Sequence, residues 1–407
     1  ERLGGVARLA RAFWPAPLAV GLVGAWLRYH DLSAQIVLDD EWHSLFRAAS
    51  EDLVTVATEY ARIATSIPMN VFNKVLLDTW GFSEVSVRLV TILATLGIFA
   101  VLPWGVLRMF GSKTMAIAAS ILFAFSPFWI FYGMSARPYA PYFLLLFVGY
   151  VSLGGMLVEK GLRSAVTFGV SAALAIYFHL YALPALAGAA LLVVWKLAQA
   201  VRRDGFGAAE PRRLLLQTGV AAGLCGALLL ILLLPAVLTG VRLPPEKEGQ
   251  FFNLAFAREA VELLTGARYP DVAWLLTASA LFGVWLAGRR NQSFMILLGL
   301  GLSSSLLLTL YTRPNFFHVA LVTWRYNLTV FLLYFVGLAA CADALIAKLA
   351  SFVAARSGRS AERAVAPAAL VALGLLVVLT SPIPRDLSLR PNNFRLHSAF
   401  QEGYSPW

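Results

Sequence analysis

The chain has 407 residues, of which 59% are hydrophobic and 14% are charged, and its net charge is +11. Soluble domains are roughly 45–50% apolar and about 25% charged, and a chain of this length cannot hide so much apolar surface from water. The composition excludes a soluble globular protein and predicts one embedded in a lipid bilayer. Cys225 and Cys341 lie in separate apolar runs without a CxxC motif, so we expect buried thiols.

Apolar runs that can cross a bilayer occur throughout the chain, since a spanning helix needs roughly 17–25 such residues. We assign eleven, in chain order: 13–30, 84–107, 114–131, 139–157, 164–179, 180–198, 214–238, 272–288, 293–311, 324–346 and 365–381. The sequence therefore predicts an all-α polytopic membrane protein with about 11 transmembrane helices.

The basic residues indicate which side of the membrane each loop occupies. Lys and Arg gather in the N-terminal segment and in the loops that share its side, for example at Arg108, Arg203 and Arg290. The positive-inside rule places these segments in the cytoplasm. Topology then accounts for the basicity, so we expect membrane lipids and no nucleic acid as partners. The longer loops face the outside, and there we expect the chemistry: 31–83, 132–138, 239–271 and 312–323.

The first outer loop contains two short amphipathic segments. Segment 51–64 has an apolar helical stripe, and segment 71–82 has a stripe from Val71 to Trp80 opposite Asn73, Lys74 and Asp78. Both are too short and too charged to span, and we predict two interfacial helices that frame an outer cavity. Packing of both segments against the spans is the alternative.

Three adjacent acids, Asp39, Asp40 and Glu41, follow the first span and precede His43. Mutual repulsion at a membrane edge should raise the pKa of at least one of them. Such a carboxylate can accept a proton from a hydroxyl, or hold a divalent cation together with His43. A solvated acidic turn without chemistry is equally compatible with the spacing.

Further stretches along the chain resemble the GT-C glycosyltransferases, in particular the bacterial branch of lipid A aminoarabinose transferases and protein mannosyltransferases. The resemblance covers about residues 13 to 346. Besides the outer Asp40-Glu41, the matching stretches are Ser66-Ile67-Pro68-Met69-Asn70, Gly81 to Leu89, Ser135-Ala136-Arg137-Pro138-Tyr139-Ala140, Tyr177-Phe178-His179-Leu180-Tyr181-Ala182 and Trp324-Arg325-Tyr326. Relatives often carry His or Glu immediately before the Pro, where this chain has Ser66 and Ile67.

The resemblance implies a GT-C fold and a glycosyltransferase in the bacterial inner membrane, with its active site facing the periplasm. It implies a polyprenyl-phosphate sugar as donor and a lipid, glycan or protein hydroxyl as acceptor. No G-x-G-x-x-G segment is present to hold a nucleotide, which agrees with a lipid-borne donor. A transporter or flippase of lipid-linked sugars is the alternative, although the sequence shows no internal repeat.

The resemblance also assigns roles to individual residues. Asp40 becomes the general base, with Glu41 as its catalytic partner. Arg137, Arg325 and Tyr326 are expected to bind the donor phosphate. The expected substrate-binding residues are Asp39, His43, Tyr139, His179 and Tyr181. Snorkelling of the two arginines to lipid headgroups, and a purely structural His179, are the alternatives.

Three further expectations concern the framework. Arg88 should form an i, i+4 ion pair with Glu84 at the start of the second span. Residues 1–381 should form one transmembrane catalytic domain, in which loop 240–271 closes over bound substrates. Residues 382–407 are expected to be an extracytoplasmic tail, open to being the start of a region that this sequence lacks. No cofactor is assigned apart from the alternative of a divalent cation.

Overall fold

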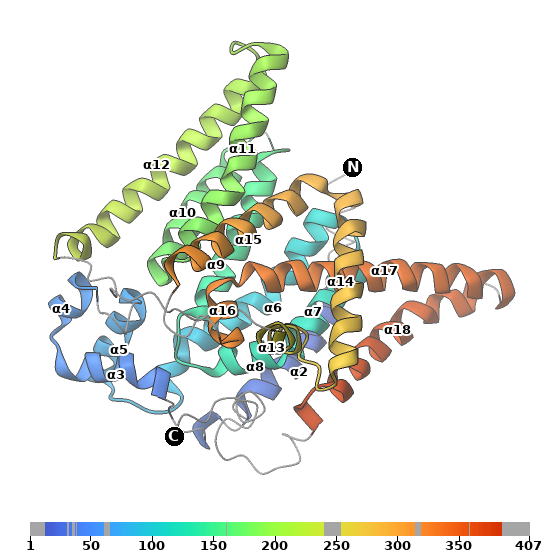
Figure 1. Ribbon diagram of the computed structural model, residues 1–407, viewed down its shortest axis with the longest axis horizontal. Helices are drawn as coiled ribbons and strands as arrows, with labels where there is room; N and C mark the ends of the chain where they lie inside the picture. Colours follow the sequence, from blue (N-terminus) through green and yellow to red (C-terminus); the bar gives the residue numbers. More distant parts are fainter. Residues whose placement is uncertain are drawn as a thin grey trace.

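The structure is a computed structural model that describes residues 13–30, 32–34, 37, 39–60, 66–159, 161–239, 254–313, 319–357 and 359–384. For residues 34, 39, 40, 357 and 359–363 it describes the backbone alone. The described parts are built from helices, without a β-strand among them (Figure 1). This agrees with the predicted all-α class. The predicted tail beyond residue 384 and most of the predicted lid lie outside the described residues.

The helices follow one another along the chain. They are α2 (Pro15–Tyr29), α3 (Asp39–Ser50), α4 (Leu53–Thr58), α5 (Ile67–Thr79), α6 (Leu89–Phe110), α7 (Lys113–Ala124), α8 (Pro127–Met134), α9 (Tyr139–Met156), α10 (Arg163–Phe178), α11 (Ala182–Asp204), α12 (Ala209–Leu238), α13 (Leu254–Thr265), α14 (Pro270–Arg290), α15 (Gln292–Thr312), α16 (Ala320–Tyr326), α17 (Thr329–Ser357) and α18 (Arg359–Thr380), with 3₁₀ turns at Leu32–Ala34 and Ser86–Arg88. Each predicted span corresponds to one or two of these helices.

Within the described residues, seven helices are long and apolar enough to cross a membrane, or eight if the bent pair α7–α8 counts as one span. They are α6 with the 3₁₀ turn before it, α9, α11, α12, α14, α15 and α17. The shorter α10 and residues 364–380 of α18 are also apolar. The fold is thus a multi-pass membrane protein, while the number of eleven spans stays a prediction.

The predicted span 114–131 is broken. α7 ends at Ala124, and α8 begins at Pro127 with a bend of 64° between them. The proline explains the break, because its ring disfavours helical geometry in Ser126 and it has no N–H to donate. The prediction of one continuous helix was wrong here.

A buried arginine of α2 satisfies the end of α7. The Arg28 guanidinium donates to the carbonyl oxygens of Ala124 at 2.9 Å and Phe123 at 3.0 Å, and to Gly24 of its own helix at 2.7 Å. It also lies 5.1 Å from the centroid of the Phe99 ring. The last carbonyls of a helix have no partner within that helix, so Arg28 stabilises the break inside an apolar core.

The predicted span 324–346 is interrupted as well. Asn327 separates α16 from α17 and is fully buried. Its side-chain oxygen accepts from the Ser305 hydroxyl at 2.6 Å, and its amide donates to the Thr323 carbonyl at 2.8 Å. Arg325 and Tyr326 therefore end a short separate helix. The prediction that they begin the long span was wrong.

The helices α14 and α17 cross at two glycines. A Cβ atom added to Gly283 would lie 1.7 Å from the Gly337 carbonyl oxygen, so only glycine fits at this position. Small residues permit such close approaches between membrane helices.

We expect Gly283→Ala to push the two helices apart and to lower the free energy of unfolding by about 1–3 kcal/mol. Gly288→Ala is the matched control, because no atom lies within 4 Å of its added Cβ. Thermal unfolding of both variants in one detergent is the measurement. Equal midpoints for the two would contradict the crossing described here.

The described residues of the predicted first outer loop include the helices α3, α4 and α5, which group together beside one end of α12 (Figure 1). Thr239 at the end of α12 donates to the Thr58 carbonyl at 3.0 Å. Within the described part of segment 51–64, residues 51–60, the helix covers Leu53–Thr58, and the second helix begins earlier than predicted, at Ile67. The helix α3 was not predicted.

The buried face of α5 differs from the predicted stripe. Asn73, expected on the polar face, is fully buried, whereas Trp80, expected on the apolar face, is 84% exposed. Asn73 turns inward because its amide donates to the Ser44 hydroxyl of α3 at 2.8 Å. The predicted stripe was therefore wrong at these two positions, whereas Leu76 is buried as predicted.

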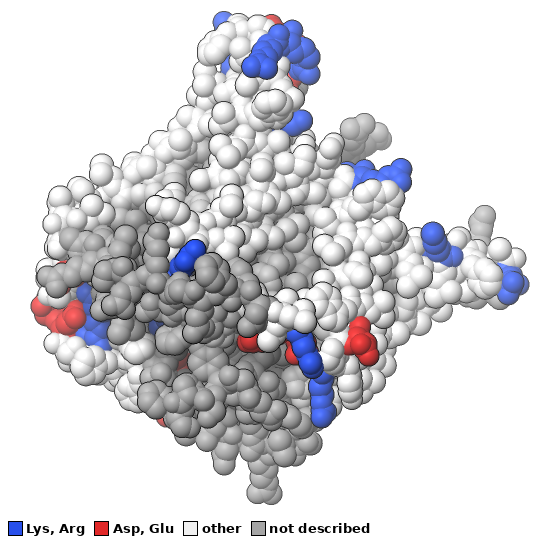
Figure 2. Space-filling model, in the orientation of Figure 1, with Lys and Arg blue, Asp and Glu red and all other residues white. Residues whose placement is uncertain are grey.

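Charged side chains occupy distinct parts of the surface. Figure 2 shows Lys and Arg at the tip that joins α11 to α12 and near the ends of α14 and α17, with a broad uncharged surface between them and α3–α5. The last turns of these helices supply the basic residues: Arg202 and Arg203 in α11, Arg289 and Arg290 in α14, and Arg356 in α17. Cations also stabilise helix C-termini.

Candidate functional site

Segments that are far apart in the sequence meet where α6, α9 and α11 begin. These segments are the start of α3, the turn between α8 and α9, the turn between α10 and α11, and the end of α16. They carry most of the predicted site residues. The contacts between them determine what the site can do.

A fully buried ion pair fixes the start of α3. The Arg88 guanidinium donates to both carboxylate oxygens of Glu41, each at 3.1 Å, and both side chains are inaccessible to solvent. Arg88 touches Glu84 only through that residue's carbonyl oxygen, at 3.1 Å. The predicted Arg88–Glu84 ion pair was therefore wrong. Arg88 pairs with the buried carboxylate of Glu41 and not with the exposed carboxylate of Glu84. A buried charge is stable only when a partner of opposite charge and hydrogen bonds compensate for the lost water.

The same carboxylate holds the turn between α8 and α9. One oxygen of Glu41 accepts the Ala136 backbone N–H at 2.6 Å. The Thr91 hydroxyl of α6 donates to the Arg137 carbonyl at 3.2 Å. Because Glu41 follows Asp40 and Ala136 precedes Arg137, this bond joins the backbone that carries the predicted base to the backbone that carries the predicted phosphate ligand.

Two arginines converge on one aromatic ring. The guanidinium carbon of Arg137 lies 5.9 Å from the centroid of the Tyr139 ring, and that of Arg325 lies 5.8 Å from the same centroid. Arg137 comes from the turn before α9 and Arg325 from α16, which are nearly 190 residues apart in the sequence. Arg325 also lies 5.5 Å from the ring of Tyr326. The structure thus brings the two predicted phosphate ligands together.

His179 lies among the same aromatic residues. It stacks on Tyr142 with ring centroids 5.1 Å apart, and its ring lies 5.7 Å from Tyr139 and 5.6 Å from Tyr326. Burial, followed by the charges of Arg325 and Arg137, lowers the pKa of His179 to about 3. His179 is therefore neutral near pH 7, and the positive charge of the site comes from the arginines.

Tyr181 completes this cluster. Its ring stacks on that of Tyr326 with centroids 4.5 Å apart, and its hydroxyl lies 2.9 Å from the Thr312 hydroxyl at the end of α15. Burial raises the pKa of Tyr181 to about 12. Tyr181 thus presents a neutral phenol at the site.

The helix α16 is positioned by the part of the predicted lid that the structure describes. The Trp324 indole N–H donates to the Ala260 carbonyl of α13 at 2.8 Å. Gly266, which follows α13, has a positive φ of 69°, and a Cβ there would lie 2.3 Å from Pro127. The helix α13 is therefore packed between the start of α8 and α16, the helix that carries Arg325.

The acidic triplet is only partly described. Glu41 is buried and paired, and His43 is a half-buried residue of α3. Asp39 and Asp40 form the first turn of α3, and their side chains lie outside the described residues. Among the side chains that the structure does describe, no three His, Cys, Asp or Glu lie close enough to hold a metal ion.

A polar network between α3 and α5 was missed by sequence reasoning. The Ser44 hydroxyl donates to the Asn70 side-chain oxygen at 2.7 Å and accepts from Asn73. Ser44 and Asn70 border a cavity of about 10 Å³ that also reaches Ser66 and Arg137, enough room for one water. The spacing of Asn70 and Asn73, one helical turn apart, was the available signal.

No protein-family model and no curated protein matches the sequence. Solved structures do match the fold. ArnT from Cupriavidus metallidurans in the apo state has a TM-score of 0.54 and 16% identity, over 93% of this chain and 71% of that one. The same protein bound to undecaprenyl phosphate has a TM-score of 0.51 and 18% identity, over 94% and 72%. At these identities the likeness concerns the fold: the chain has a fold like that of ArnT, in agreement with the fold that its sequence motifs implied.

Proposed function

We propose that this chain is a glycosyltransferase that moves a sugar from a polyprenyl-phosphate donor to an acceptor hydroxyl. The reaction takes place at the extracytoplasmic face of the bacterial inner membrane. The observation that carries the proposal is the convergence of Arg137 and Arg325 on Tyr139, next to the segment that carries Asp40. One structure of similar fold was solved with undecaprenyl phosphate, which is the kind of lipid that such a site would bind.

The two arginines would bind the donor phosphate. As the bond between the anomeric carbon and the phosphate oxygen breaks, its electron pair leaves with that oxygen and the charge on the phosphate grows. Guanidinium groups that are already in place stabilise this growing charge more than the ground state, which lowers the barrier. Arg suits the task because its N–H groups can bond two phosphate oxygens at once.

The acceptor side would be served by the start of α3. Asp40 takes the proton of the acceptor hydroxyl while the oxygen forms its bond to the anomeric carbon. Glu41 cannot serve as a second base while it is bonded to Arg88 and the Ala136 N–H, so we assign it a positioning role. Asp39 and His43 flank these residues and would contact the acceptor or the sugar.

The aromatic cluster would contact the sugar. Its rings come from three different segments and belong to Tyr139, His179, Tyr181 and Tyr326. His179 is neutral, so the phosphate would be bound by the two arginines. Rings of this kind pack against the apolar faces of sugars while their polar atoms bond hydroxyls. This arrangement would hold the anomeric carbon between the phosphate and the acceptor.

Replacing either arginine tests the proposal. We expect Arg137→Ala and Arg325→Ala each to lower kcat/KM by about 100-fold, since each removes one stabilising cation from the transition state. The assay follows the undecaprenyl phosphate released from synthetic undecaprenyl-phosphate sugars by the protein in nanodiscs supplied with a bacterial lipid extract.

Arg289→Ala is the matched control, because Arg289 lies at the exposed end of α14, on the ring of Trp285. It should retain full turnover. Undiminished turnover in both site variants would contradict the phosphate assignment. Arg137→Lys should retain part of the rate that Arg137→Ala loses, because lysine keeps the charge but lacks the paired N–H groups.

A further inference from the structure

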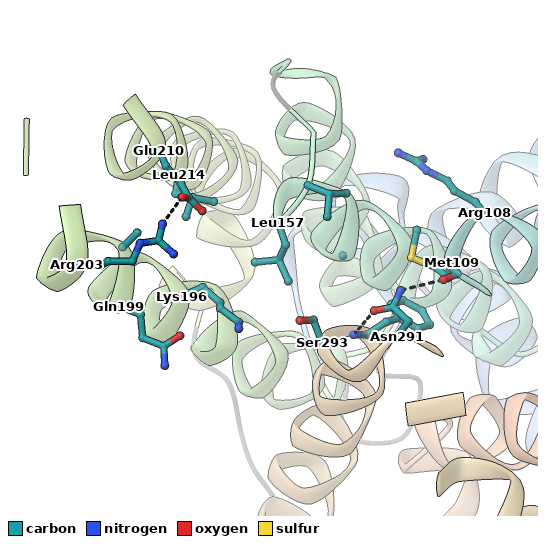
Figure 3. Close-up of a pocket in the computed structure, with 14 residues that line it drawn as sticks. Arg108, Met109, Leu157, Lys196, Gln199, Arg203, Glu210, Leu214, Asn291 and Ser293 are labelled. Carbon is teal, nitrogen blue, oxygen red and sulfur yellow. Dashed lines mark hydrogen bonds and ion pairs between the residues drawn. The ribbon is translucent and has the colours of Figure 1, made fainter. Parts of the chain in front are cut away.

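A second polar site lies at the opposite ends of the helices that frame the candidate site. A cavity of about 350 Å³ opens between the later turns of α6, α9 and α11, the start of α12 and the start of α15 (Figure 3). Arg88, Tyr139 and Tyr181 mark where the first three of these helices begin. At 1.5 Å per residue, a helix of the length of α6 separates the two sites by roughly 30 Å, about the thickness of a bilayer core.

The cavity is lined by cations and by neutral groups that donate hydrogen bonds. Its polar lining residues are Arg108, Lys196, Gln199, Arg203, Asn291 and Ser293, with Glu210 as the acid at its rim. Arg108 pairs with Glu159, and Arg203 pairs with Asp204 and Glu210. Lys196 has no ion-pair partner among the described residues. In Figure 3 its side chain points from α11 toward Ser293.

The start of α15 adds to this positive field. Asn291 caps the helix by accepting the Phe294 N–H at 3.0 Å, and its amide donates to the Met109 carbonyl at 2.9 Å. These two bonds hold the N-terminus of a 21-residue helix at the cavity wall. The positive end of a helix dipole favours anions, above all phosphate groups.

We propose that this cavity binds the phosphate of an anionic ligand, with Lys196 as its charged contact and Ser293 as a hydrogen-bond donor. The surroundings favour a phospholipid headgroup over a soluble phosphate ester. The wall includes Leu157, Val158 and Phe294, and neighbouring α12 exposes most of its apolar length. A headgroup can therefore enter the cavity while its acyl chains lie along α12. This site is separate from the proposed transferase site and does not depend on it.

Native mass spectrometry of the whole chain tests this inference. Protein freed of lipid is titrated with phosphatidylglycerol, and separately with phosphatidylcholine, glycerol phosphate and inorganic phosphate. We expect Lys196→Gln to weaken phosphatidylglycerol binding by about fivefold, the effect of losing one lysine at an anionic headgroup. Lys348→Gln is the matched control, since Lys348 is an exposed lysine of α17 outside the cavity.

A second variant distinguishes a loss of binding from a loss of folding. Ser293→Asp places an acid in the first turn of α15, where it stabilises the helix while repelling an anion in the cavity. It should keep the wild-type melting temperature and weaken phosphatidylglycerol binding at least as much as Lys196→Gln. Equal binding by glycerol phosphate would keep the phosphate site and assign it a soluble ligand. Identical binding by the lysine variants, or unchanged binding in Ser293→Asp, would overturn the inference.

Discussion

Replacing Asp40 by asparagine should lower sugar transfer by about 10²–10⁴-fold, the usual contribution of a general base. The amide has nearly the same shape as the carboxylate but cannot take the acceptor proton at neutral pH. Affinity for undecaprenyl phosphate should stay unchanged, because the phosphate is assigned to Arg137 and Arg325 on other segments. Single-turnover assays combined with lipid-binding measurements separate these two effects.

Asp78→Asn is the matched control for this variant. Asp78 lies on α5 in the same loop, its carboxylate is half-exposed, and it pairs with Lys74 at 3.1 Å. It should transfer sugar at the wild-type rate. If Asp40→Asn retained full turnover, the base would have to be another residue. If it lost lipid binding together with turnover, the acid would be acting on the donor.

The second large effect concerns stability. Glu41→Gln and Arg88→Gln should each lower the free energy of unfolding by about 3–5 kcal/mol, because each leaves a buried charge without its partner. The double variant Glu41→Leu/Arg88→Met should be less destabilised than either single variant, since it removes both charges and keeps the volume. Denaturant or thermal unfolding in detergent measures all three.

Lys74 and Asp78 provide the comparison for this pair. They form an ion pair in which the Asp78 side chain is 49% exposed and that of Lys74 15%, and its removal should change stability by about 1 kcal/mol or less. Strictly additive losses at Glu41 and Arg88 would contradict the coupling. Even when folded, the double variant should bind undecaprenyl phosphate more weakly, because the Ala136 N–H loses the acceptor that holds the Arg137 turn.

The sequence predicted the class of fold because apolar runs report directly on lipid burial. It failed where a local feature interrupts a run. Ser126-Pro127 breaks the third predicted span and Asn327 the tenth, although both lie in windows that remain apolar on average. A proline after a serine was the readable signal in the first case. In the second, the hydrogen bond that Asn327 accepts from Ser305 comes from α15 and is invisible in the sequence.

The same distinction applies to the candidate site. The positions of Arg137 and Arg325 at helix ends allowed both to be singled out, and the structure brings them to one tyrosine ring. The partner of Arg88 could not be read from spacing, because Glu84 offered a pair within one helical turn while Glu41 lies 47 residues away. Asn73 was predicted on the wrong face because a stripe of apolar residues does not reveal its hydrogen-bond partner, the Ser44 hydroxyl on another helix.

Arg28 has a consequence for how the protein is made. Arg28 lies in the last turn of α2, and a charged guanidinium without polar partners is costly in lipid. The open carbonyls of Phe123 and Ala124 would be costly there too. The guanidinium and the carbonyls can bond one another only once α2 and α7 are in contact. The helix α2 should therefore stay at the insertion machinery until α7 has emerged, and the two should enter the bilayer together.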